Sequence, residues 1–276
     1  MDIQLIATDL DGTALQNDHK SFSPRLCAAF EEAHRRGLHI LPITGRQYPL
    51  LPPPLLAKPQ WGNLAVLCNG SEVRELNTGK LRHGVYMNRE QVSAVIDIAG
   101  QLNIPVEASL RGTLYLTKKD WDFQFHFDGL HFHKTILQAH GCQVTNLREF
   151  VMDQAAGYEK INLTWIPPER MDTLQRLLAP VGLSCVLASG SSMEVTHAEA
   201  TKEKGLRRAC GLLGIDMDKV MCMGDSGNDA SMLQSAGFSV AMGNAPDNIK
   251  ALAHSITDRN DEDGAAKAIE RYALSR

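Results

Sequence analysis

The sequence has no large excess of either charge and no long apolar run. Its 276 residues include 28 basic and 32 acidic side chains, which give a formal net charge of -4. A strong positive field is therefore absent, so we expect neither nucleic acid nor another polyanion as a partner. The opening residues, MDIQLIATDLDGT, combine an acidic second position with a short apolar stretch, which fits neither a signal peptide nor a membrane-spanning helix. We therefore expect a cytoplasmic protein without a membrane partner.

Paired cysteines and biased segments are also missing. The cysteines are scattered and include no C-x-x-C pair of the kind that binds zinc or cycles between thiol and disulfide. We expect them to be buried thiols in a reducing compartment. They are Cys27, Cys68, Cys142, Cys185, Cys210 and Cys222. With 43% hydrophobic and 22% charged residues, the composition is that of a packed globular protein.

Two stretches of the sequence alternate between strand-like and helix-like patterns. Residues 3–8 form a short apolar run that ends in carboxylates, as expected for a buried parallel strand. Ser23-Pro24 then predicts the start of a helix that ends near Gly37. A second strand follows at 38–43, and the C-terminal third repeats the pattern with helix 201–213, strand 220–223, helix 229–236 and strand 238–242. This alternation predicts an α/β fold with a doubly wound, Rossmann-like parallel sheet.

The middle of the chain interrupts this pattern. Residues 83–187 contain the histidine-rich text FQFHFDGLHFH and a Pro-Pro break. We therefore predict a catalytic core made of 1–82 and 188–276, with an inserted α/β domain at 83–187. Within segment 126–133, the side chains of His126, His131, His133 and Asp128 suggest a second metal site, but their spacing matches no standard zinc pattern, and packed or exposed histidines are favoured.

Two carboxylates stand at the end of the first predicted strand. Asp9 and Asp11, in DLDGT, lie two residues apart and so on the same side of an extended chain, while Gly12 permits a sharp turn. One carboxylate can act as a nucleophile while the other transfers protons, which is most of what phosphoryl transfer requires. The alternative is a carboxylate-rich turn that caps a helix.

Three further sites follow strand-like runs. Thr44 and Gly45 can hold phosphate oxygens with a hydroxyl and backbone N–H groups, or can form an ordinary turn. The loop GDSGND at 224–229 concentrates oxygen ligands that suit Mg²⁺, and helix capping explains only one of its acids. Lys202 and Lys204 oppose the dipole of a helix that starts near them, so they are either surface lysines or neighbours of a bound anion. Loops at the carboxyl ends of parallel strands converge, so we expect the four sites in one crevice.

Together these motifs resemble the haloacid dehalogenase (HAD) superfamily, and specifically its Cof-type branch, which carries a large α/β cap. The matching segments are DLDGT at 9–13, ITGR at 43–46, LCNGSEV at 67–73 and GDSGND at 224–229. The resemblance implies a Mg²⁺-dependent phosphatase that forms an aspartyl-phosphate and hydrolyses a small phosphomonoester, such as a sugar phosphate, pyridoxal phosphate or a flavin- or nucleotide-like phosphate. The inserted domain would be the cap that selects the substrate.

The resemblance also implies residue roles. Asp9 would be the nucleophile and a metal ligand, and Asp11 the general acid/base, with its backbone carbonyl on the metal. Asp225 would be the third ligand, supported by Asp229. The phosphoryl oxygens would be held by Leu10, Thr44, Gly45, Lys202 and Asn228. Spacing to the fourth motif favours Lys202, although Lys204-Gly205 mimics the Lys-Gly pair of the family.

One departure from the family and two alternatives remain. The prolines at 49 and 52–54 predict a loop where related chains continue a helix. A phosphotransferase or phosphomutase would use the same residues to pass the phosphoryl group to an organic hydroxyl. A non-catalytic phosphometabolite-binding module is disfavoured because the carboxylates of the first and fourth motifs are all present. The sequence names neither the substrate nor the oligomeric state.

Overall fold

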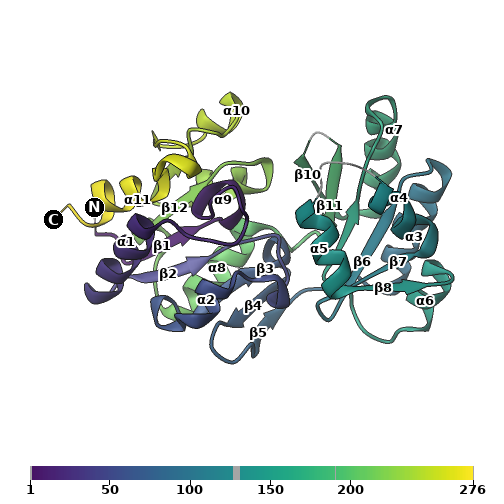
Figure 1. The fold of residues 1–276 in the computed structure, drawn as a ribbon, viewed down its shortest axis with the longest axis horizontal. Helices are drawn as coiled ribbons and strands as arrows, with labels where there is room; N and C mark the ends of the chain where they lie inside the picture. Colours follow the sequence, from purple (N-terminus) through teal and green to yellow (C-terminus); the bar gives the residue numbers. More distant parts are fainter. Residues whose placement is uncertain (1, 127–130, 190, 276) are drawn as a thin grey trace. The chain divides into compact units, whose positions relative to one another are not determined.

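The computed structural model describes residues 2–126, 131–189 and 191–275. The chain divides into two compact units, one formed by Met1–Gly84 with Thr201–Arg276 and the other by Val85–Ala200. Each unit has its own main sheet (Figure 1). The predicted fold class, a parallel α/β core with an inserted α/β unit, is confirmed.

The first unit is built on five parallel strands. Their order is β14-β13-β12-β1-β2, and each neighbouring pair is parallel. The chain passes from β1 through a helix to β2, and from β12 through a helix to β13, which is the doubly wound connection that the sequence predicts. The strands are β1 (Leu5–Thr8), β2 (His39–Pro42), β12 (Val220–Gly224), β13 (Phe238–Ala241) and β14 (Ser255–Ile256).

Helices bury both faces of this sheet. In β1, Ile6 packs into one apolar cluster, while Leu5 and Ala7 pack into the other. The first cluster includes residues of α1 (Pro24–Arg35) and α11 (Gly264–Ala268); the second includes residues of α8 (Lys202–Leu213), α9 (Ala230–Ser235) and α10 (Asp247–Lys250). Burial on both faces explains why these strands read as continuous apolar runs.

Side-chain caps fix the starts of two helices. The Ser23 hydroxyl accepts a hydrogen bond from Leu26 N at 3.1 Å, and a proline occupies the first position of α1. Thr201 caps α8 in the same way, accepting from Lys204 N at 3.2 Å. Each cap satisfies one backbone N–H that has no partner within the helix. The cap of α8 places Lys202 at its first helical position.

A small antiparallel sheet and a proline-rich stretch complete the first unit. The small sheet contains β3 (Leu64–Leu67), β4 (Glu72–Glu75) and β5 (Leu81–Gly84). A parallel bridge between Ile43 and Val66 joins β3 to the chain after β2. The predicted loop after Arg46 is wrong in part, because α2 (Pro53–Ala57) forms there. Its prolines occupy the first helical positions, where no N–H is needed.

The second unit contains a six-stranded sheet in the order β10-β11-β9-β6-β7-β8. Only β7 and β8 run parallel. Its strands are β6 (Val106–Leu110), β7 (Thr113–Thr117), β8 (Gly141–Val144), β9 (Lys160–Leu163), β10 (Ser184–Ser189) and β11 (Ser192–Thr196). One face packs against α3 (Arg89–Gln101), α6 (Leu147–Asp153) and α7 (Pro168–Leu178); α4 (Lys118–His126) and α5 (His131–His140) contact β7 and β8.

Two expectations need correction. The second unit extends to Ala200 rather than 187, because β11 pairs with β9 and β10 and therefore belongs to this sheet. Cys142 and Cys185 are exposed rather than buried, since they lie on the two edge strands, β8 and β10. All six cysteines are free.

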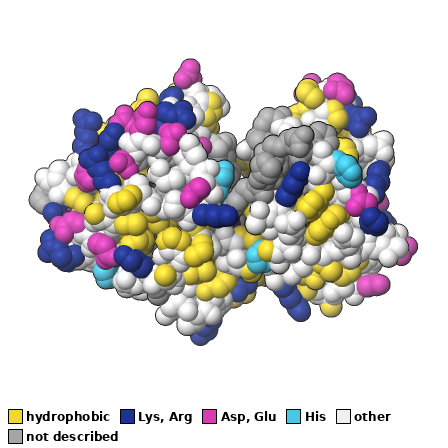
Figure 2. All heavy atoms as spheres, viewed as in Figure 1, with side chains coloured by type: hydrophobic (Ala, Val, Ile, Leu, Met, Phe, Trp, Pro, Cys, Tyr) yellow, Lys and Arg dark blue, Asp and Glu magenta, His cyan; other side chains and the backbone are white. Residues whose placement is uncertain are grey.

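The surface carries charges of both signs. On the face seen in Figure 2, lysine and arginine side chains alternate with aspartate and glutamate. In residues 2–126, 131–189 and 191–275, none of the helices is both long and apolar enough to cross a membrane.

Candidate active site

Asp9 lies immediately after β1 and is almost fully buried. Its backbone N donates to Met223 O at 3.0 Å, which fixes it between the ends of β1 and β12. Only 4% of the residue is exposed. Its Oδ1 accepts a hydrogen bond from Lys202 Nζ at 2.7 Å. A buried carboxylate at the carboxyl end of the sheet is thus paired with a buried ammonium.

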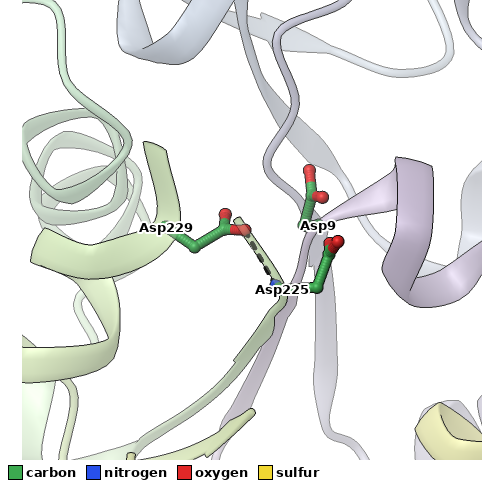
Figure 3. Close-up of side chains that lie close together, drawn as sticks. All are labelled: Asp9, Asp225 and Asp229. Atoms are coloured by element: carbon green, nitrogen blue, oxygen red, sulfur yellow. Dashed lines mark hydrogen bonds between the residues drawn. The ribbon is translucent and has the colours of Figure 1, made fainter. Parts of the chain in front are cut away.

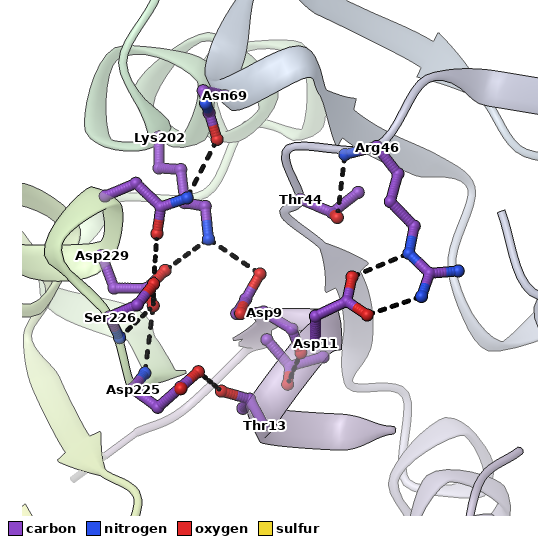
Figure 4. A network of polar contacts seen from close by, with 12 residues as sticks. Asp9, Asp11, Thr13, Thr44, Arg46, Asn69, Lys202, Asp225, Ser226 and Asp229 are labelled. Carbon is purple, nitrogen blue, oxygen red and sulfur yellow. Dashed lines mark hydrogen bonds and ion pairs between the residues drawn. The ribbon is translucent and has the colours of Figure 1, made fainter. Parts of the chain in front are cut away.

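Lys202 is the lysine that reaches this carboxylate. It is 1% exposed, and its Nζ also donates to Asp229 Oδ1 at 2.6 Å (Figure 4). Lys204, two residues along the same helix, is only partly buried. Residues two apart point about 200° from each other around a helix, so the two lysines face different surroundings. The structure brings the side chain of Lys202 to Asp9 and Asp229.

Three carboxylates converge here from two loops. One oxygen from each of Asp9, Asp225 and Asp229 lies within 4.8 Å of the others, and Figure 3 shows the three side chains close together. Asp229 Oδ2 accepts from the backbone N of both Asp225 and Ser226 at 3.0 Å. Both oxygens of Asp229 are therefore engaged, one by the loop and one by Lys202. Asp229 holds the loop in shape.

Gly12 is required for the approach of Asp225. It has φ +76°, and a Cβ at this position would lie 2.4 Å from Asp225 Oδ2. Thr13 Oγ1 donates to Asp225 Oδ1 at 2.9 Å, and Asn244 Nδ2 donates to Gly12 O at 2.8 Å. The turn after Asp9 is thereby fastened to Asp225.

Burial and mutual repulsion disfavour the ionised forms of Asp9 and Asp225. Burial raises the pKa of Asp9, as do the neighbouring carboxylates Asp229 and Asp225, although Lys202 opposes the shift. Burial, together with Asp229, also raises the pKa of Asp225 to about 6. The pKa of Lys202 is raised because Asp229 and Asp9 outweigh the opposing effect of its burial. With every group ionised, one ammonium faces three carboxylates, and two negative charges remain uncompensated.

Asp11 points away from the cluster and is clamped. Arg46 Nε and Nη2 donate to its two oxygens at 2.7 and 2.6 Å, and His19 Nδ1 lies 2.8 Å from Oδ1. Arg46 also donates to the backbone oxygens of His19 and Leu50. Burial alone would raise the pKa of Asp11, but the bonds from His19 and Arg46 outweigh it and lower the pKa to about 2. In this arrangement Asp11 is an ionised acceptor, and it must leave Arg46 before it can donate a proton.

Apart from Lys202, the residues predicted to bind phosphate lie after the strands β1, β2 and β12. Thr44 is 1% exposed, and its hydroxyl accepts from Arg46 N at 3.1 Å. Leu10 is buried and Gly45 is partly exposed. Asn228 Oδ1 accepts from Ser226 Oγ at 2.7 Å, and its Nδ2 donates to Asn69 Oδ1 at 3.1 Å. The amide of Asn228, within the acidic loop, is thus held at both ends.

The sequence reasoning missed several residues of this site. It assigned no role to Thr13, His19, Arg46, Asn69 or Asn244, all of which bond to predicted site residues. Three of them lie inside quoted motifs, DLDGT, ITGR and LCNGSEV, so closer attention to those motifs would have included them. His19 and Asn244 stand in loops without a motif, and no local pattern points to them.

The histidine-rich segment forms no metal cluster among the described residues. His133 Nε2 lies 2.6 Å from Glu107 Oε1 and 2.8 Å from Gln124 Oε1, and His126 Nδ1 contacts the backbone oxygen of Asp122. Asp128 and the side chain of His131 lie outside the described residues.

The donor set at Asp9, Asp225 and Asp229 fits magnesium. Mg²⁺ prefers hard carboxylate and carbonyl oxygens and keeps several waters. Asp9 and Asp225 each have lone pairs that the bonds described above leave free, because each carboxylate oxygen carries two. A divalent cation would also balance the two uncompensated negative charges.

The comparison with known proteins identifies the family. A model of haloacid dehalogenase-like hydrolases matches residues 6–269. This chain belongs to that family. The predicted membership of the HAD superfamily is confirmed, and so is the predicted class of enzyme, because the family consists of hydrolases and the similar proteins below are named phosphatases.

The similarity to HAD phosphatases extends over the whole chain. It is 28% identical to the 5-amino-6-(5-phospho-D-ribitylamino)uracil phosphatase YcsE of Bacillus subtilis, over 99% of this chain and 97% of that protein. It is 27% identical to the pyridoxal phosphate phosphatase YbhA of Escherichia coli, over 99% and 100%. Among solved structures, the HAD subclass IIB sugar phosphatase BT4131 superposes with a TM-score of 0.83 at 22% identity, covering 98% of this chain and 99% of that one.

Proposed function

We propose that this HAD enzyme hydrolyses small phosphomonoesters through an aspartyl-phosphate on Asp9. One observation carries the proposal: Asp9, a buried carboxylate at the end of the internal strand β1, is held by Lys202 through one oxygen, Oδ1. The bond described leaves the other oxygen available for attack. An aligned nucleophile beside positive charge is what a phosphoryl group requires.

The proposed reaction has two steps. Asp9 Oδ2 attacks phosphorus, and the bond from phosphorus to the ester oxygen breaks. Asp11, once it has left Arg46 and taken up a proton from solvent, gives that proton to the leaving alkoxide. Asp11 then removes a proton from a water molecule, which attacks the phosphorus of the aspartyl-phosphate, releases inorganic phosphate and restores Asp9. The backbone of Leu10, the hydroxyl of Thr44, the backbone of Gly45, Asn228 and the ammonium of Lys202 hold the phosphoryl oxygens.

Magnesium is the proposed cofactor. Asp9 and Asp225 would hold it with their side chains and Asp11 with its backbone carbonyl, while Asp229 supports the loop behind them. When bound, the ion supplies positive charge that offsets repulsion between the anionic nucleophile and the phosphate.

The second unit is proposed to select the substrate. One face of its sheet packs into an apolar cluster, whereas the other carries a polar row across three strands: Glu107, Asn162 and Glu194 are opposite one another in register. Asn162 Nδ2 donates to Glu107 Oε2 at 2.8 Å, and Lys160 forms an ion pair with Glu194. A buried polar atom costs free energy unless it has a hydrogen-bond partner, and Asn162 Oδ1 is buried without one among the described residues. Recognition of the organic part of a small phosphorylated metabolite would explain the presence of this polar row, and the similar proteins named above act on such compounds.

A screen of phosphorylated metabolites tests this function. The purified chain is mixed with sugar phosphates, pyridoxal phosphate and flavin-related phosphates, with magnesium or with excess chelator, and free phosphate is measured. Release that depends on magnesium is expected. Phosphate found on an added organic hydroxyl instead would assign the chain to the phosphotransferases, and binding of metabolites without either product would make it a non-catalytic sensor.

A further inference from the structure

The turn Cys68–Gly70 contains three successive residues with positive φ. The values are 49° for Cys68, 56° for Asn69 and 102° for Gly70. Two of the three carry a side chain, and left-handed backbone is unfavourable for such residues, although Asn tolerates it better than most. All three are buried. A buried run of strained residues persists only where its surroundings hold it, and such runs gather at functional sites.

Backbone contacts fasten this turn to two elements of the active site. Asn69 N donates to Thr44 O, and Cys68 N donates to Arg46 O, both at 3.0 Å. On the other side, a Cβ on Gly70 would lie 2.1 Å from Thr201 O, so only glycine permits the turn to approach the residue that precedes Lys202. The turn therefore lies between the phosphate-binding loop at Thr44 and the start of α8.

The side chain of Asn69 reaches a third element. Its Oδ1 accepts the 3.1 Å bond from Asn228 Nδ2, and Ser226 Oγ donates to Asn228 Oδ1 at 2.7 Å (Figure 4). The Asn228 amide is thus held at both ends, with its nitrogen toward Asn69. Among the described contacts, the second hydrogen on that nitrogen has no acceptor, which leaves it available for an anion.

We infer that Asn69 is a positioning residue for phosphoryl transfer. It orients the Asn228 amide so that Nδ2 donates to a phosphoryl oxygen, and the strained turn keeps that amide in register with Thr44 and Lys202. This inference rests on the proposed function, because Asn228 would have no anion to orient toward if the chain bound no phosphate.

Glycine at position 69 separates this role from a purely structural one. Glycine adopts φ +56° without strain, so Asn69→Gly preserves the turn and its backbone bonds but deletes the bond to Asn228. If Asn69 served only the turn, Asn69→Gly would have wild-type activity and a stability equal to or higher than that of the wild type. The matched control is Asn103→Gly, since Asn103 also has positive φ, 48°, but lies in the turn after α3, in the other unit.

The experiment compares the wild type with Asn69→Gly, Asn228→Ala, the double variant and Asn103→Gly. The measurements are kcat and KM for p-nitrophenyl phosphate with magnesium, the inhibition constant of inorganic phosphate, and the melting temperature. We expect Asn69→Gly to lower kcat/KM by about tenfold and to weaken inhibition by phosphate by a similar factor, with an unchanged melting temperature. The double variant should have the same kcat/KM as Asn228→Ala, because both substitutions remove the same hydrogen bond, between Asn69 and Asn228. Asn103→Gly should match the wild type in the kinetic constants.

Every other result contradicts the inference. Asn69→Gly kinetics within about twofold of the wild type, full additivity with Asn228→Ala, or a loss of activity that follows a lower melting temperature would each overturn it and leave the proposed function intact. A wild-type chain that neither hydrolyses the ester nor binds phosphate would overturn both.

Discussion

At the scale of single residues, Lys202 is tightly held in the site. It is a fully buried cation between two buried carboxylates, Asp9 and Asp229. Removing one partner from such a pair leaves charge uncompensated in a poorly solvated place, which typically costs about 3–5 kcal/mol. The position therefore matters for folding and, in the proposed mechanism, for the charge that meets the phosphoryl group.

The two lysines of α8 give a direct comparison. Lys202→Ala should lower kcat/KM by about a hundredfold or more, because it removes the ammonium beside the proposed nucleophile. Lys204→Ala should change it little. Activity per folded molecule is measured well below both melting temperatures, so that a loss of stability is not counted as a loss of catalysis. A larger effect at Lys204 would contradict the assignment of the phosphate-binding lysine.

At the scale of elements, local sequence patterns predicted where helices begin and where the strands of the parallel sheet lie. Ser23-Pro24 and Thr201 mark helix starts through side-chain bonds to residues three positions later, and apolar runs mark the strands of the parallel sheet. The end of the second unit was misplaced because β11 joins its sheet through pairing with β9 and β10, which is a non-local property. The clamp on Asp11 was equally hidden, since His19 reaches it from a loop with positive φ.

The attachment of α5 to the sheet of the second unit should depend on pH. His133 on α5 is paired with buried Glu107 on β6, with Gln124 of α4 beside it and Lys160 of β9 opposing the pair. Burial lowers the pKa of His133, but Glu107 outweighs burial, and the net pKa is raised above 6.5. A raised histidine pKa contributes stability that is complete below about pH 6.5 and is lost as pH rises through the folded-state value.

Thermal unfolding across pH tests this attachment. Between about pH 6 and 9, the melting temperature of the wild type should fall more steeply than that of His133→Gln, since the variant has no proton to lose at this position. His140→Gln, at the other end of α5, is the matched control and should keep the wild-type slope. Parallel curves for wild type and His133→Gln would show that the pair does not titrate in this range.

At the scale of the whole molecule, two separately packed units share one chain. The first unit brings Asp9, Thr44, Lys202 and Asp225 together from four regions of the sequence. Three of them follow parallel strands, whose loops meet at one edge of the sheet, and Lys202 begins α8. Motif spacing was therefore enough to predict that these four residues lie close together, but not the residues that bond to them, such as His19 and Asn244. The substrate could not be predicted, because the polar row proposed to recognise it, Glu107, Asn162 and Glu194, arises from strand register rather than from a local motif.

Magnesium should stabilise the molecule as well as activate it. A ligand at a hundred times its dissociation constant adds about 2.7 kcal/mol to the free energy of unfolding, so millimolar magnesium should raise the melting temperature by several degrees. Asp225→Asn should abolish this increase, because it weakens the oxygen cluster. Asp18→Asn should preserve it, since Asp18 binds Lys20 and Ser21 outside the cluster. An equal increase in wild type and Asp225→Asn would place the ion elsewhere.

The identity of the phosphorylated residue tests the proposed mechanism most directly. Enzyme quenched in acid during turnover is reduced with borohydride, which converts an aspartyl-phosphate to homoserine, and the modified position is read by mass spectrometry. We predict homoserine at position 9, together with a loss of turnover on the order of a thousandfold in Asp9→Asn, measured where the variant is fully folded. Modification at Asp11 or Asp225, or near wild-type turnover by Asp9→Asn, would contradict the mechanism.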